Sequence, residues 1–217
     1  MMSNSALAAV RCGGYALAAL FALGLARADP QTLELPVIGS GSYASDGVFS
    51  ARTCISGIGN AFGNETRGFL VFDLTPLPAR ALVRSARLKV ENLASANDRA
   101  PWFGVYGLPH TDAGNFGRPG SPDSNRSNFR YIGSHSTPLF ARRDVPAVGS
   151  ASFVELEFNA AGVADLNQRR GDAYYALGLR VTLADAQAPR PLQYLFGGAS
   201  TRPLAQRATL VVQYVDE

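Results

Sequence analysis

Cysteine, histidine and lysine are scarce in this chain of 217 residues, which has two cysteines, two histidines and a single lysine, Lys89. Cys12 falls in a predicted signal peptide, so Cys54 has no cysteine with which to form an internal disulfide. The sequence therefore excludes a disulfide framework and a cysteine-based zinc site. We expect Cys54 to be a buried thiol in a strand, the alternative being a disulfide between two chains.

Residues 1–28 have the organisation of a secretory signal peptide. Arg11 gives a short positive region, residues 13–26 form an apolar run, and Ala26-Arg27-Ala28 has the small residues that signal peptidase recognises. The alternative is a membrane anchor, but the run is shorter than the roughly 20 apolar residues that span a bilayer. We expect cleavage after Ala28 and a secreted protein, periplasmic or extracellular, without a membrane span.

The charge argues against a nucleic-acid partner. Without Arg11 and Arg27, Lys+Arg falls from 20 to 18 against 17 Asp+Glu, so the net charge of residues 29–217 is about +1. The basic residues form no stripe of the kind that a phosphate backbone requires.

The most informative stretch is 66–92, TRGFLVFDLTPLPARALVRSARLKVEN. Its first apolar run, 69–74, is apolar on both faces, whereas the run at 86–91 alternates. This pattern is typical of a strand deep in a β-sandwich followed by a half-exposed neighbour. In the second strand we expect Ala86, Leu88 and Val90 to face inward, and Arg87, Lys89 and Glu91 to face outward.

Similar runs predict strands elsewhere, including 154–158, 175–183, 192–196 and 208–215. One helix is expected to begin after Asn159 and to end near Gly171. Residues 39–47 are predicted to form turns, 110–128 a long loop and 129–132 a short strand. The prediction is one all-β domain over 29–217, an antiparallel β-sandwich of the jelly-roll type with one short helix.

Several motifs occur in order along residues 29–217. They are Gly41-Ser42-Tyr43 with Gly47; Ile55-Ser56-Gly57; Arg67, Phe69, Val71, Phe72, Asp73 and Leu74; Val83, Ser85, Ala86 and Leu88; Phe158-Asn159; Leu166-Asn167; Leu177-Gly178; and Tyr194-Leu195-Phe196-Gly197-Gly198. They resemble a family of secreted bacterial domains, many in proteins with a PEP-CTERM sorting tail, described as DNRLRE-type, carbohydrate-binding-like sandwiches. The resemblance implies fold and export more than activity. The chain lacks the PEP-CTERM tail, so sorting by that tail is not implied.

No arrangement of residues indicates catalysis. His110 and His135 are the only histidines, and the chain has no H-x-x-x-H, H-E-x-x-H or nucleophile-elbow motif. Glu155 and Glu157 share one strand face, whereas glycosidases place two carboxylates on opposite sides of a sugar. We therefore predict that the protein is not an enzyme. The alternative is a polysaccharide-acting enzyme that uses loop carboxylates and His110.

Oxygen-bearing side chains crowd the predicted loop 110–128. A structural calcium ion held by Asp112, Asn115, Asp123 and Asn125 is one hypothesis, with Asn128 and Asp98 as further candidates. The alternative is turn formation, because Asp and Asn are also preferred turn residues. No other cofactor is predicted.

Asp73 ends a hydrophobic strand, where an unpaired buried carboxylate would be unfavourable. We expect it to cap the Thr75-Pro76 turn, the alternative being an ion pair with Arg67 or Arg84. Both roles are structural, and both predict that Asp73→Ala destabilises the fold.

Four aromatic residues are candidates for a sugar-binding platform: Trp102, Tyr106, Tyr43 and Phe116. The alternative for each ring is core packing. The sequence thus predicts a non-catalytic secreted module whose partner is an extracellular polysaccharide or a matrix or envelope protein. A self-assembling structural surface protein is a further hypothesis.

Overall fold

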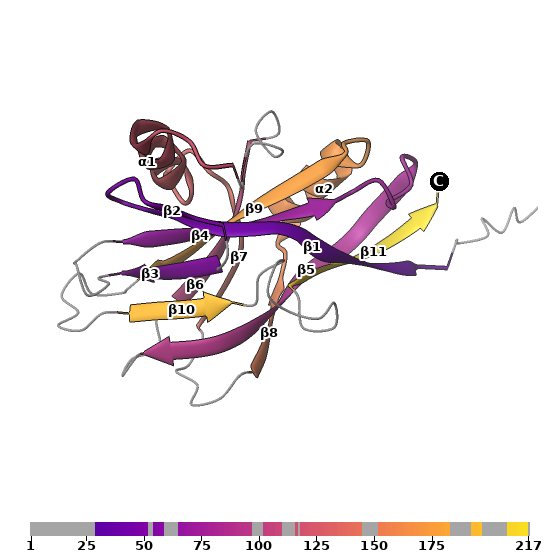
Figure 1. Cartoon of the computed structure of the whole chain (residues 1–217). Helices are drawn as coiled ribbons and strands as arrows, with labels where there is room; N and C mark the ends of the chain where they lie inside the picture. Colours follow the sequence, from indigo (N-terminus) through magenta and orange to yellow (C-terminus); the bar gives the residue numbers. More distant parts are fainter. Residues whose placement is uncertain are drawn as a thin grey trace, which may run out of the picture.

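A computed structural model describes residues 29–51, 54–58, 65–96, 102–109, 116, 118–144, 152–182, 192–196 and 208–216. The predicted signal peptide lies outside these residues. Figure 1 shows the strands and the short helices α1 and α2. Their bounds are β1 Gln31–Ala44, β2 Phe49–Ser50, β3 Cys54–Ile58, β4 Thr66–Asp73, β5 Ala81–Ala96, β6 Trp102–Gly107, α1 Pro122–Tyr131, β7 Leu139–Asp144, β8 Ser152–Glu157, α2 Ala160–Arg169, β9 Tyr174–Thr182, β10 Leu192–Phe196 and β11 Thr209–Asp216.

Antiparallel hydrogen bonding joins the strands into one sheet. Its order is β2-β1-β11-β5-β10-β3-β4-β9-β6-β7, with β8 beside β5. A further pairing of β1 with β4 closes six of these strands into a ring, so that the sheet resembles a barrel. The predicted all-β class is confirmed. The hydrogen bonds do not divide the strands into the two separate sheets that a sandwich would have.

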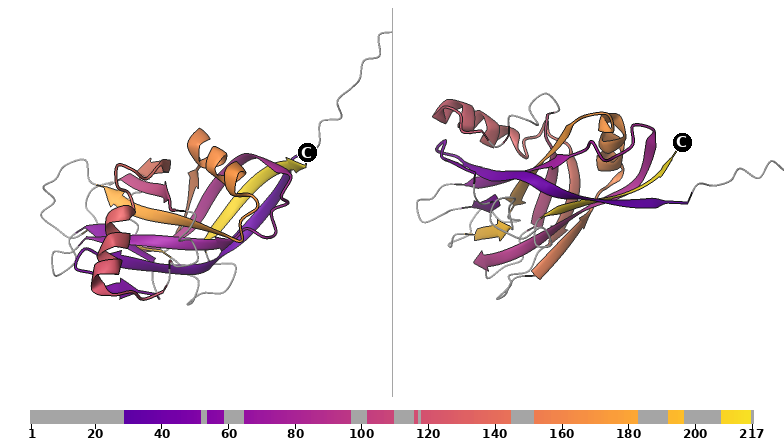
Figure 2. Two further views of the ribbon diagram at one scale, coloured as in Figure 1. Left: turned by 90° about the horizontal axis from the view of Figure 1, so that it is seen from above. Right: turned by 45° about the vertical axis from the view of Figure 1, so that its right-hand side comes forward.

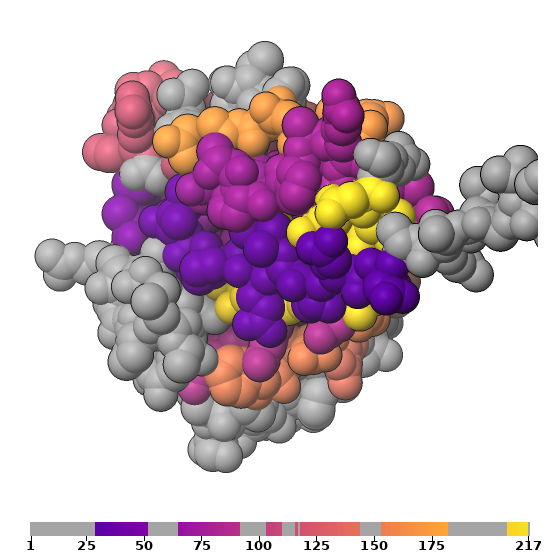
Figure 3. All heavy atoms as spheres, turned by 90° about the vertical axis from the view of Figure 1, so that its right-hand side faces the viewer, coloured from indigo at the N-terminus to yellow at the C-terminus, as the bar shows by residue number. Residues whose placement is uncertain are grey.

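Strand β1 is long because it has two successive partners. Residues 31–36 pair with β11 and residues 37–44 pair with β4, with a bulge between Val37 and Gly39. Figure 3 shows β1, in indigo, beside β11, in yellow. The predicted turn over 39–47 is therefore wrong for 39–44. Glycine is needed within this strand because a Cβ at Gly41 would lie 2.3 Å from the backbone oxygen of Ser50.

Strands β4 and β5 are neighbours in sequence only. Hydrogen bonds pair β4 with β1, β9 and β3, whereas β5 pairs with β11, β10 and β8. As predicted, β4 is buried on both faces, and Ala86, Leu88 and Val90 of β5 lie in the core. The expected exposure of Glu91 is wrong, since this residue is only 7% exposed. Alternation identifies the face on which a side chain lies, but not what covers that face.

Helix α2 forms where the sequence predicts a helix. The side chain of Asn159 accepts a hydrogen bond from the backbone N–H of Gly162 at 3.1 Å, as an N-cap does. Leu166 is fully buried in the main core and Val163 packs against it. The Asn167 side chain joins α2 to β5, since it accepts from the backbone N–H of Val83 at 2.9 Å and donates to its carbonyl at 3.0 Å.

Helix α1 corrects two predictions. Residues 122–128 are helical rather than loop, and the expected strand at 129–132 is wrong because the helix continues to Tyr131. The side chain of Ser121 accepts a hydrogen bond from the backbone N–H of Ser124 at 3.2 Å, and Pro122 opens the helix. The polar composition that suggests a loop belongs to a surface helix whose buried residues are Asn125 and Phe129.

Helix α1 lies over the outer face of the sheet (Figure 2). A second apolar cluster lies between this helix and the sheet. Its buried members are Tyr43, Phe69, Val71, Leu108, Phe116, Phe129, Ile132 and Ala176, with Phe49 packed against them. This cluster explains why β4 is apolar on both faces, since one face meets the main core and the other meets α1. Within the described part of the chain, neither helix combines the length and the apolar character needed to cross a membrane.

Candidate functional site

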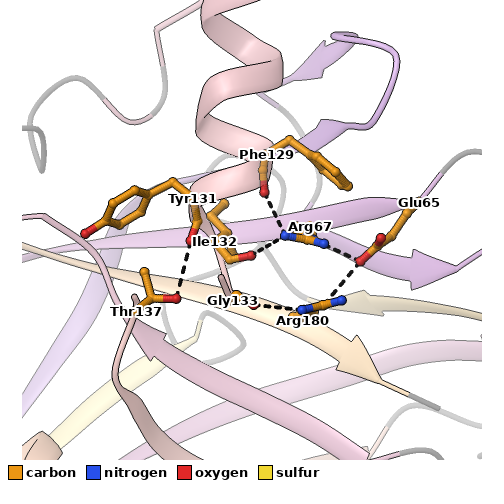
Figure 4. A network of polar contacts seen from close by, with 8 residues as sticks. All are labelled: Glu65, Arg67, Phe129, Tyr131, Ile132, Gly133, Thr137 and Arg180. Atoms are coloured by element: carbon orange, nitrogen blue, oxygen red, sulfur yellow. Dashed lines mark hydrogen bonds and ion pairs between the residues drawn. The ribbon is translucent and has the colours of Figure 1, made fainter. Parts of the chain in front are cut away.

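Arg67 of β4 is a buried cation at the C-terminal end of α1 (Figure 4). Its Nη1 donates to the carbonyl oxygens of Phe129 at 3.0 Å and Ile132 at 2.6 Å, and its Nε donates to Glu65 at 2.9 Å. Its guanidinium also lies 4.2 Å from the centre of the Phe129 ring. The carbonyls at a helix C-terminus have no partners within the helix and attract positive charge. Arg67 thus holds α1 against the sheet.

Arg180 of β9 extends this contact. It donates to the carbonyl oxygen of Gly133 at 2.7 Å, and its Nε lies 3.3 Å from the same Oε1 of Glu65 that Arg67 binds. One carboxylate therefore serves two guanidinium groups, one from each of two adjacent strands. The arrangement is structural, because the hydrogen bonds and the ring contact of the Arg67 side chain join it to Glu65 and to α1 and its C-cap.

Asp73 makes the turn contacts expected of a cap. Its Oδ1 accepts from the backbone N–H of Thr75 at 2.9 Å and from the Thr75 hydroxyl at 2.7 Å. These two hydrogen bonds, the hydroxyl first, lower the pKa of Asp73. The alternative partner Arg67 binds Glu65 instead.

A second buried network fixes α2. The Tyr175 hydroxyl donates to Asp165 at 2.9 Å, and Arg169 donates to the other oxygen of Asp165 at 3.1 Å. Burial, and then the negative charge of Asp165, raise the pKa of Tyr175 well above its usual value. A tyrosine so fully buried is suited to packing the helix on the sheet, and not to proton transfer with a substrate.

The predicted aromatic platform is not exposed in the described part of the chain. Tyr43 and Phe116 are buried in the cluster beneath α1, with their ring centres 6.2 Å apart. Tyr106 is also buried, and the side chain of Trp102 lies outside the described residues. The three described rings therefore pack within the protein and offer no open stacking face.

The candidate calcium ligands are only partly described. Asp98, Asp112 and Asn115 lie outside the described residues. Asp123 pairs with Arg126, and the amide of Asn125 joins the carbonyl of Gly47 to both backbone groups of Gly120. Among the described residues, no group of three or more His, Cys, Asp and Glu side chains is arranged to hold a metal ion.

The histidines do not form a described site. His110 lies outside the described residues, and His135 is exposed in the turn that follows α1. Glu155 and Glu157 are both exposed on β8, as the alternation predicts.

The outer face of β5 and β8, called the β5–β8 face below, brings charged side chains together around an exposed aromatic ring. Directly opposite pairs on this face are Arg87 with Glu157, Lys89 with Glu155, and Glu91 with Phe153. Phe153 is 47% exposed, and the ammonium of Lys89 lies 4.8 Å from the centre of its ring. Arg87 also forms an ion pair with Glu155 at 3.4 Å. An exposed ring among charged groups of both signs is a surface on which a polar ligand can stack and form hydrogen bonds.

Phe153 is not among the aromatic residues that the sequence suggests for a platform. The signal was present, because the alternation that turns Val154 and Leu156 inward places Phe153 outward with Glu155.

No protein-family model matches the chain. No curated protein matches it with significant similarity either.

Proposed function

We propose that this chain is a non-catalytic, exported module that binds an extracellular polysaccharide on the β5–β8 face. The observation that carries the proposal is the position of Phe153, an exposed aromatic ring on a sheet face among Lys89, Glu91 and Glu155. Sugar rings stack on aromatic faces through their C–H surfaces, while neighbouring polar groups bind their hydroxyls.

Two further observations support the proposal. Arg67 donates to the backbone carbonyls of Phe129 and Ile132, and Asp165 accepts from Arg169 and Tyr175, so these buried polar groups serve as scaffold contacts. The signal-like residues 1–28 and the resemblance to secreted bacterial domains support export to the periplasm or the extracellular space. The same resemblance supports classification of the nearly closed sheet as a distorted jelly-roll sandwich.

Retention on insoluble polysaccharides tests the proposal. The protein is incubated with a panel of neutral, acidic and amine-bearing polysaccharides, and the bound fraction is measured. Phe153→Ala should abolish retention, whereas Tyr174→Ala should leave it unchanged. Tyr174 is a matched control because it is also an aromatic ring, 47% exposed, on a different strand. The proposal would be wrong if no polysaccharide retained the wild type or Tyr174→Ala. It would also be wrong if Phe153→Ala and Tyr174→Ala lost retention equally.

A further inference from the structure

The face of the Phe153 ring is already occupied by an ammonium group of the protein itself. Lys89 lies diagonally across the β5–β8 pair from Phe153, and its Nζ is 4.8 Å from the ring centre. This is the geometry of a cation–π contact, in which the negative ring face attracts a positive charge. The ring therefore has an environment suited to a cation.

Carboxylates surround this position. Glu155 lies directly opposite Lys89, and Glu91 lies directly opposite Phe153. Glu91 is only 7% exposed, and no hydrogen-bond donor among the described residues reaches its Oε2. A buried carboxylate oxygen without a donor is unfavourable, and its charge is less screened than that of a surface carboxylate. Glu91 therefore adds a negative potential at the ring without needing to touch a ligand.

We infer that the β5–β8 face recognises an organic ammonium group. In the free protein the ammonium of Lys89 occupies the position of the ligand, and binding displaces it. The inference rests on the proposed function and specifies it, since the polysaccharide would be one that bears free amines. Lys89 is long and flexible enough to swing away, and its departure leaves both the ring and Glu91 to the incoming cation. Acidic polysaccharides would be disfavoured by Glu91 and Glu155.

Two sets of soluble oligosaccharides provide the test: glucosamine oligomers with free, protonated amines, and the same oligomers after N-acetylation. Calorimetric titration should show at least tenfold tighter binding of the free-amine form, weakened by salt. Lys89→Ala should bind it about two- to fivefold more tightly, because no internal ammonium competes. Glu91→Gln, which keeps the shape of the side chain, should bind it more weakly, and thermal melting should show that both variants remain folded.

Because Lys89 is the only lysine, its displacement can be observed directly. Reductive methylation keeps its charge and adds carbon-13 methyl groups, whose resonance should be shifted by the Phe153 ring. Binding of the free-amine oligomer should remove that shift, as Phe153→Ala should without ligand. Binding of the two oligomers with equal affinity, or weaker binding by Lys89→Ala, would overturn the inference. Phe153-dependent binding of only a neutral polysaccharide would do the same, yet leave the proposed function intact.

Discussion

Replacement of Arg67 by methionine tests how α1 is held on the sheet. Methionine fills most of the volume of the side chain but removes its charge and its donors. The change deletes two hydrogen bonds from a charged donor to the carbonyls of Phe129 and Ile132, each contributing about 1.5 kcal/mol at the low end for such bonds. The contact with the Phe129 ring adds about 1 kcal/mol.

Glu65 limits the damage. It keeps its contact with Arg180 at 3.3 Å, so the variant does not leave an uncompensated carboxylate of the kind that makes a broken buried pair so unfavourable. We therefore expect Arg67→Met to lower the free energy of unfolding by about 4 kcal/mol, a large share of the roughly 5–15 kcal/mol typical of a domain.

Arg180→Met is the matched control. Arg180 also contacts Glu65, but it donates to only one carbonyl, that of Gly133, and its side chain is 29% exposed. Its replacement should lower the free energy of unfolding by about 1.5 kcal/mol. Urea denaturation with an unchanged m value measures both variants. If Arg67→Met were no more destabilising than Arg180→Met, the assignment of Arg67 as the principal anchor of α1 would be wrong.

Two predictions concern pH. Thr75 lowers the pKa of Asp73 from its ordinary value of 3.8. The contribution of Asp73 to the free energy of unfolding is therefore present above that value and is lost as pH falls through the folded pKa. Asp73→Ala should destabilise the protein by about 1 kcal/mol near neutral pH and by less in acid. A constant difference across an acid titration of urea midpoints would contradict this. Because the pKa of Tyr175 is raised, the folded state keeps a proton that the unfolded state loses above about pH 10. The free energy of unfolding should therefore fall as pH rises through the alkaline range. The fall should be less steep in Tyr175→Phe, which has no hydroxyl to ionise. Parallel stability curves for wild type and Tyr175→Phe at alkaline pH would rule out this role.

Most strands, and helix α2, were predictable because their local signals agree with their surroundings. Alternation in β5 and β8 matches the inward positions of Leu88, Val154 and Leu156. In α2, Asn159 provides the cap and Leu166 provides the buried contact, so capping and periodicity indicate the same helix.

Helix α1 was not predictable in the same way, because its anchor is distant in sequence. The hydrogen bond from Arg67 reaches the carbonyl of Phe129 across 62 positions. The local sequence, PDSNRSNFRY, shows no apolar stripe and reads as a loop. Tertiary contacts supply the stability that the segment lacks by itself.

The same helix accounts for the aromatic residues predicted to be a platform. Tyr43 and Phe116 lie beneath α1, so once the helix is missed their burial is missed as well. Strand alternation places the Phe153 ring outward, but this does not by itself indicate a binding site, since single exposed apolar side chains are common. Burial of Glu91 depends on the residues packed around this one position of the β5–β8 face, which strand alternation cannot indicate.

The pairing of β1 with β11 determines when the sheet can be completed. The hydroxyl of Tyr214 on β11 binds Gln31 on β1, across 183 positions of the chain. While the chain emerges from the ribosome, β1 and β5 both lack their shared partner β11, so their backbone groups remain open to pairing with other chains. A protein of this topology can cover these strand edges only when its last strand has been made. Truncation before β11 would therefore lower the amount of folded protein through aggregation, before it affected any binding surface.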